Sequence, residues 1–122
     1  MERHDFEQLV AETLDSLPPD LRQLLDNVEV TVTGWPSPAV RKTAGLRPGQ
    51  MLFGLYQGVP QTRRTSHYGL VPPDKITIFQ GPIEQLCRSS AAIRAQVRKT
   101  VLHELAHHFG ISDQRLREIG TV

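Results

Sequence analysis

Apolar residues recur at helical spacing at both ends of this sequence and alternate with polar residues between them. The first apolar series predicts an amphipathic helix over residues 5–17, which a pair of prolines ends. A short second helix is expected over residues 21–27, started by Asp20. The last long series predicts a helix over residues 90–109, which Gly110 can terminate. Its apolar stripe consists of Ile93, Val97, Val101, Leu105 and Phe109.

The middle of the chain is predicted to carry the strands. Residues 28–33, VEVTVT, alternate strictly between valine and polar residues, which is typical of a half-buried strand. Residues 51–58, MLFGLYQG, and residues 75–79, KITIF, predict two more strands. The segments 34–50 and 61–74 are rich in glycine and proline or in polar residues, and they are expected to be loops.

Short helices are expected at residues 81–87 and 114–120, so strands lie in the middle and helices at both ends. This order is typical of the α+β class. With 122 residues, the chain has the size of a single domain, and residues 1–122 are interpreted as one.

Composition removes several classes of function. The net charge of +1 gives no electrostatic reason to expect a nucleic acid or an anionic membrane as partner. The single cysteine, Cys87, excludes an intrachain disulfide and is expected to be a small packed side chain. The N-terminal residues are charged and no long apolar run is present, so a cytoplasmic protein is expected.

The residues that can carry chemistry are concentrated in HELAHHFGISD, residues 103–113. His103 and His107 are four positions apart on the expected helix, so both imidazoles project from one face and can hold one zinc ion. The apolar stripe lies on the opposite side. Glu104 borders the face of the histidines, where a carboxylate can act as a general base toward an attacking water. The pattern is the H-E-x-x-H of zinc metallopeptidases.

Asp113 is the candidate for a third metal ligand. Gly110 lets the chain turn after the helix, and Asp113 follows His107 by six positions, where extended forms of the motif place a third ligand. Three protein ligands would leave one zinc position open for water. Asp113 could instead be only the N-cap of the last helix, although the neighbouring Ser112 could also serve as that cap.

Beyond this motif, the sequence resembles the small bacterial zincin-like metallopeptidases, also called minimal zincins. The similarity extends over roughly the C-terminal two-thirds of the chain and is carried by LFGLYQGVPQT, PDKITIFQGPI and VRKTVLHELAHHFGISDQRLREIG. The family pattern H-E-x-x-H-x-x-G-x-x-D is met in full. The resemblance implies an α+β fold with a small mixed sheet beside the active-site helix. It also implies one zinc ion held by His103, His107 and Asp113, with Glu104 as catalytic base.

The expected function is therefore zinc-dependent hydrolysis of peptide bonds in a peptide or protein. The substrate could add to the edge of the sheet along residues 51–57 or along residues 75–79. Two alternatives remain: a metal-stabilised binding or regulatory module without turnover, and a metal-dependent endoribonuclease. The endoribonuclease pattern has a third histidine where this chain has Asp113.

Four further side chains, in the motif, in the predicted strand 51–58 and in the loop 61–74, are candidates for supporting roles. His108 lies about 140° from His103 around the helix, so it is expected to turn towards the core as a packing or supporting residue. Tyr56, His67 and Tyr68 could stabilise an oxyanion, although each is more readily explained as a structural residue.

Overall fold

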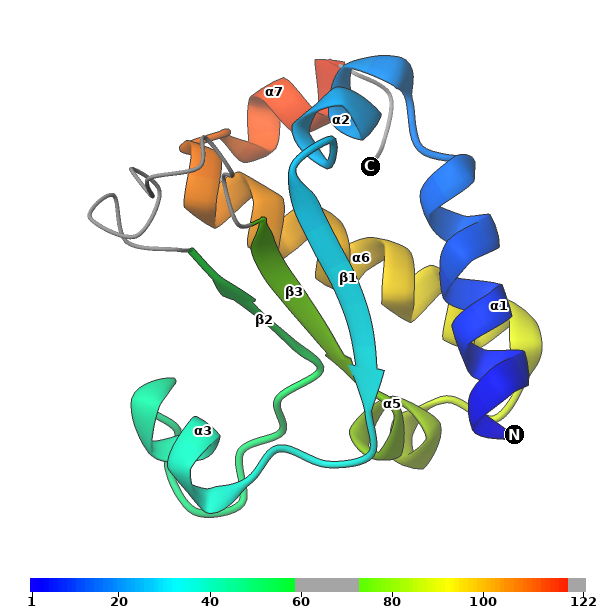
Figure 1. Cartoon of the computed structure of the whole chain (residues 1–122), viewed down its shortest axis with the longest axis vertical. Helices are drawn as coiled ribbons and strands as arrows, with labels where there is room; N and C mark the ends of the chain where they lie inside the picture. Colours follow the sequence, from blue (N-terminus) through cyan, green and yellow to red (C-terminus); the bar gives the residue numbers. More distant parts are fainter. Residues whose placement is uncertain (59–72, 119–122) are drawn as a thin grey trace, which may run out of the picture.

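A computed structural model describes residues 1–58 and 73–118 of the chain. In Figure 1 the three strands lie in front of the long helix α6, with α1 beside the sheet and the shorter helices around its ends. The elements are α1 (Arg3–Asp15), α2 (Pro19–Leu24), β1 (Val28–Thr33), α3 (Pro38–Thr43), β2 (Gly54–Gln57), β3 (Asp74–Phe79), α5 (Gln80–Leu86), α6 (Ser90–Phe109) and α7 (Asp113–Glu118). The predicted α+β class is confirmed.

The sheet is small and mixed, as the family resemblance implied. Its strand order is β1-β3-β2, with β1 parallel and β2 antiparallel to β3. Ile76 at the centre pairs with Val30 on one side and with Tyr56 on the other. Since β3 is the central strand, it cannot offer an edge to a substrate. Of the two segments considered for that purpose, only β2 lies at an edge.

The core forms where α6 and α1 pack on one face of the sheet. Ile76 and Ile78 of β3 are fully buried, as are Val97, Val101 and Leu105 of α6. Complete burial of each such side chain contributes roughly 1.5–3 kcal/mol to folding. The predicted apolar stripe of the long helix therefore packs as expected over most of its length, which leaves the opposite face of α6 free for polar side chains.

Phe109, at the end of that stripe, is an exception. Phe109 is 43% exposed at the last position of α6, where its ring lies nearly perpendicular to that of Tyr56 with 6.2 Å between centroids. The prediction that Phe109 belongs to the core is wrong. Cys87 packs against the core and is partly buried.

Two loop predictions also need correction. The expected loop 34–50 contains the helix α3, which starts with the Ser37 side chain accepting a hydrogen bond from the Val40 N–H and with Pro38 at the first position. Asp74, expected to end the second loop, is the first residue of β3. The rest of that predicted loop, except Pro73, lies outside the described residues.

Candidate functional site

The long helix α6 presents the histidine pair. The Ser89 hydroxyl caps its start by accepting a hydrogen bond from the Ala92 N–H, and Gly110 ends it in the left-handed conformation, at φ 69° and ψ 32°. His103 and His107 are both exposed, and their ring centroids lie 4.1 Å apart with the planes tilted by 52°. The two imidazoles are thus adjacent on the solvent side of α6, as the spacing predicts.

Glu104 points from α6 towards the edge strand. Its Oε2 accepts a hydrogen bond of 3.3 Å from the backbone N–H of Tyr56 in β2. This N–H is available because backbone groups of an edge strand alternate in direction: the Phe53 carbonyl accepts from Phe79 N–H on the β3 side, so Gly54 and Tyr56 face outward. The sequence did not reveal this contact, since it joins distant segments.

Tyr56 is held in place from two further sides. Its hydroxyl donates to Oδ2 of Asp74 over 2.6 Å, and its ring stacks on the His108 imidazole with 3.9 Å between centroids. Nε2 of His108 lies 3.7 Å from the same Asp74 oxygen. Asp74 is only 7% exposed, so these contacts supply partners to a buried carboxylate. The hydroxyl of Tyr56 is therefore engaged with Asp74, in keeping with a structural role.

His108 occupies a different place from the predicted one. It packs, as expected, but its side chain is 37% exposed and lies on the surface over Tyr56 and not in the core. The helical angle correctly separated it from the face that carries His103 and His107 but could not show that β2 runs beside this end of α6. The remaining oxyanion candidates, His67 and Tyr68, lie outside the described residues.

Asp113 opens α7 but does not cap it. The hydroxyl of Ser112 accepts the hydrogen bond from the Arg115 N–H over 3.1 Å, so Ser112 is the N-cap. Asp113 and His103 both line a cavity of about 360 Å³ between α6 and α7. Within residues 1–58 and 73–118, however, no three His, Cys, Asp or Glu side chains lie close enough together to hold a metal ion. The structure brings the two histidines together and leaves Asp113 across the cavity.

The donor types still suit zinc. Two imidazoles and a carboxylate are the ligands that catalytic zinc sites use, and the histidine pair fits with its present spacing on the helix. For all three side chains to bind one ion, Asp113 has to approach His103 and His107 across the cavity that it lines together with His103.

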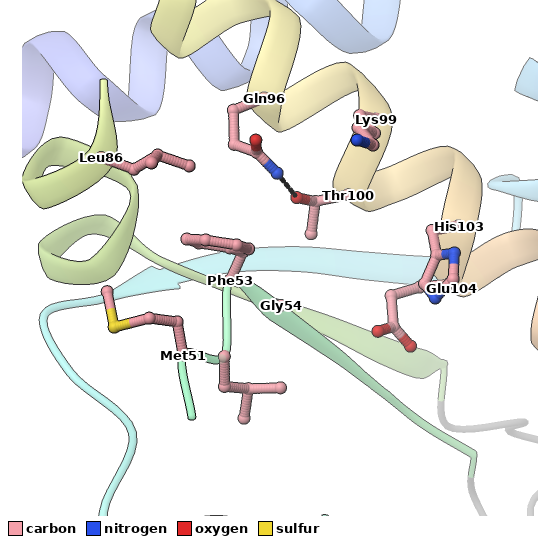
Figure 2. A pocket seen from close by; sticks show the side chains of 10 residues that line it. Met51, Phe53, Gly54, Leu86, Gln96, Lys99, Thr100, His103 and Glu104 are labelled. Carbon is pink, nitrogen blue, oxygen red and sulfur yellow. Dashed lines mark hydrogen bonds between the residues drawn. The ribbon is translucent and has the colours of Figure 1, made fainter. Parts of the chain in front are cut away.

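A second cavity, of about 430 Å³, lies on the other side of His103. It is bounded by α5, by residues 51–54 and by α6, and it is called the apolar pocket below. Figure 2 shows His103 and Glu104 at one end of it and Met51 and Leu86 at the other. The candidate zinc-binding face is thus flanked by two hollows, one towards α7 and one towards β2.

A histidine pair and a glutamate lie on one helix beside the edge strand of a small mixed sheet, which is the arrangement that the H-E-x-x-H motif predicts. Residues 25–121 match the family model described as zincin-like metallopeptidase, and the chain belongs to this family. A solved structure of a conserved hypothetical protein from T. thermophilus is similar, with 26% identity and a TM-score of 0.57. The similarity covers 89% of this chain and 94% of that one. None of the curated proteins compared matches the chain.

The helices of the described residues include none that is both long and apolar enough to span a lipid bilayer.

Proposed function

We propose that this protein is a zinc-dependent peptidase that hydrolyses peptide bonds with a water molecule activated at the face of α6. The observation that carries the proposal is the position of Glu104. Its carboxylate accepts a hydrogen bond from Tyr56 N–H at the edge of the sheet and lies near His103 (Figure 2), whose imidazole is adjacent to that of His107. Membership in the zincin-like metallopeptidase family supports a metal-dependent peptidase role.

The proposed roles follow from the chemistry of each side chain. His103, His107 and Asp113 would hold the ion, which when bound would polarise the scissile carbonyl and lower the pKa of water. Glu104 would accept the proton of the attacking water at its carboxylate and then deliver it to the leaving amine. The hydrogen bond from Tyr56 N–H would keep that carboxylate in place between the two transfers.

The edge strand offers outward backbone groups to a peptide at Gly54, a buried residue that is reached through the wall of the apolar pocket. The backbone N–H and C=O of Gly54 face away from β3, as those of Tyr56 do, and Gly54 lines the apolar pocket together with Glu104. An extended peptide pairing with Gly54 would pass in front of Glu104.

The test uses the purified protein loaded with zinc and an unbiased peptide pool analysed by mass spectrometry. Glu104→Gln should retain zinc but lose turnover by on the order of 10²–10⁴-fold, the usual contribution of a general base. Glu7→Gln, which neutralises an exposed carboxylate of α1, is the matched control and should cleave normally. Turnover that survives Glu104→Gln would remove the role given to this residue.

Zinc binding by the wild type without cleavage of any peptide would instead favour the metal-stabilised binding module. In that case the edge strand β2 would be the surface to examine for a protein partner, because its outward backbone groups can pair with another chain.

A further inference from the structure

The apolar pocket has features of a recognition site. Met51 and Leu86 are 41% and 58% exposed, and both line it. Few large apolar side chains are this exposed within residues 1–58 and 73–118. Apolar side chains exposed around one concavity indicate that a ligand covers them. A volume of about 430 Å³ also lies within the usual range of ligand sites.

The polar groups of the pocket wall leave its interior apolar. Nε2 of Gln96 donates to Oγ1 of Thr100 over 3.1 Å, so part of the polar capacity of these two side chains is used across one turn of α6 (Figure 2). Lys99 is exposed at the boundary between this pocket and the cavity beside α7, where its charged end can remain in water. The interior therefore favours an uncharged, apolar group.

The location of the pocket limits what that group can be. His103 and Glu104 form one end of it, so an occupant lies beside the reacting atoms. Gly54 lies in the same wall, two positions from Tyr56, which corresponds to roughly 7 Å along a strand. A peptide residue paired with Gly54 is therefore within about two residues of the bond that faces Glu104.

We infer that the apolar pocket selects peptides that carry a bulky apolar side chain, such as leucine, methionine or phenylalanine, within two residues of the cleaved bond. This inference rests on the proposed function and deepens it by naming the substrate class. Pairing with Gly54 aligns the peptide along β2, and the pocket between Met51, Phe53 and Leu86 receives the side chain.

The first experiment compares matched peptides that differ only at the selected position. After the cleavage site has been mapped in an unbiased pool, peptides with leucine, alanine or lysine at that position are compared by kcat/KM. Wild type should prefer leucine over alanine by roughly tenfold or more, the usual discrimination for lost methylenes. Leu86→Glu, which places a carboxylate in the pocket, should reduce the leucine preference and raise the relative rate for lysine.

Gln85→Glu is the control. It adds the same charge to the adjacent residue of α5, which is exposed and is not part of the pocket lining. Its preference should remain that of the wild type. Equal cleavage of the three peptides by the wild type, or an unchanged preference in Leu86→Glu, would overturn the inference and leave the proposed peptidase activity standing.

A second readout does not depend on turnover. The leucine and alanine peptides are titrated into metal-free, ¹⁵N-labelled Glu104→Gln protein, and the backbone amides of Phe53, Gly54 and Lys99 are followed. The leucine peptide should shift these amides at a concentration roughly tenfold lower than the alanine peptide does. If this holds while the zinc-loaded wild type cleaves nothing, the proposed function fails and the pocket remains a site for apolar side chains. Equal shifts with both peptides would contradict the selectivity of the pocket.

Discussion

The backbone N–H of Tyr56 donates a hydrogen bond of 3.3 Å to Oε2 of Glu104, joining the edge strand to the helix that carries the histidines. The proposed base is thus oriented by a main-chain N–H, which every substitution of Tyr56 except proline retains. Substitutions can, however, remove the contacts that hold Tyr56 in place, which are its hydrogen bond to Asp74 and its stacking on His108.

Tyr56→Phe removes the hydroxyl that donates to Asp74 over 2.6 Å and keeps both the ring stacked on His108 and the N–H that binds Glu104. Loss of a hydrogen bond to a buried carboxylate should lower the free energy of unfolding by about 1.5 kcal/mol. Urea unfolding of the metal-free protein measures this change. Zinc content should be unaffected, and Tyr56→Ala, which also loses the stack, should be less stable than Tyr56→Phe.

Gly54→Ala should push β2 away from α6. A Cβ at this position would lie 2.6 Å from Cγ2 of Thr100 and 3.2 Å from the backbone oxygen of Thr77. Such overpacking costs roughly 1–3 kcal/mol, and the displaced strand would withdraw Tyr56 from Glu104. Loss of both stability and turnover is expected, measured by thermal unfolding and by peptide cleavage.

Thr100→Ser provides the compensating change, because it deletes Cγ2 and keeps the hydroxyl that accepts from Gln96. The double variant should recover a substantial part of the stability lost by Gly54→Ala. The stability changes of the two single variants are added to give the value expected without coupling. If the double variant is no more stable than this value, the contact with Thr100 is not the cause of the loss.

Gly110→Ala tests the turn between the histidines and Asp113. The residue has φ 69°, a conformation that costs an L-residue about 1–2 kcal/mol. The free energy of unfolding should fall by that amount, and zinc affinity, measured by competition with a chromophoric chelator, should fall as the turn shifts. Gly110→Asn is the control and should be milder, since asparagine tolerates this conformation. Identical effects of both substitutions would point to a cause other than backbone conformation.

Ser112 and Asp113 should separate capping from metal binding. Ser112→Ala removes the hydroxyl that accepts from Arg115 N–H, so it should lower stability by about 1 kcal/mol and leave zinc affinity unchanged. Asp113→Ala should change the stability of the metal-free protein by less than about 1 kcal/mol. Asp113→Ala should weaken zinc binding by on the order of 100-fold, because loss of a ligand should cost at least as much affinity as loss of a residue that only orients a ligand.

Unchanged zinc affinity in Asp113→Ala would exclude this residue as a ligand. The third ligand would then have to come from elsewhere in the chain or from water.

The pattern of apolar and polar residues predicted the helices and strands better than it predicted the contacts of the candidate site. The bounds of β1 and α6 agree with the sequence pattern, because valine alternation and a four-residue apolar repeat each act within a single element. The adjacency of His103 and His107 is of the same kind, since it follows from one turn of helix. The short helix α3 was not predicted because its Ser37–Pro38 start signal stands among other glycines and prolines.

The contacts between elements could not be predicted in this way. Tyr56 reaches Glu104 because β2 pairs with β3 on the side towards α6, and the sequence pattern contains no information on strand order. The surface position of His108 likewise results from the place of β2 beside α6, since His108 stacks on Tyr56 of that strand. The role of Ser112 as the N-cap was one of two options on sequence alone, and only the observed hydrogen bond to Arg115 N–H decides it.

The parallel pairing of β1 with β3 has a consequence for how the protein folds. Val28 pairs with Asp74, so a long loop must close before β1 can join the sheet, and β2 is part of that loop. The two histidines need only the α6 helix, which local contacts can form early. Glu104 acquires its partner only after a further long-range closure, over the 48 positions between Tyr56 and Glu104, has brought β2 alongside. The potential to bind a metal thus precedes the assembled site, and the complete arrangement is a property of the finished fold alone.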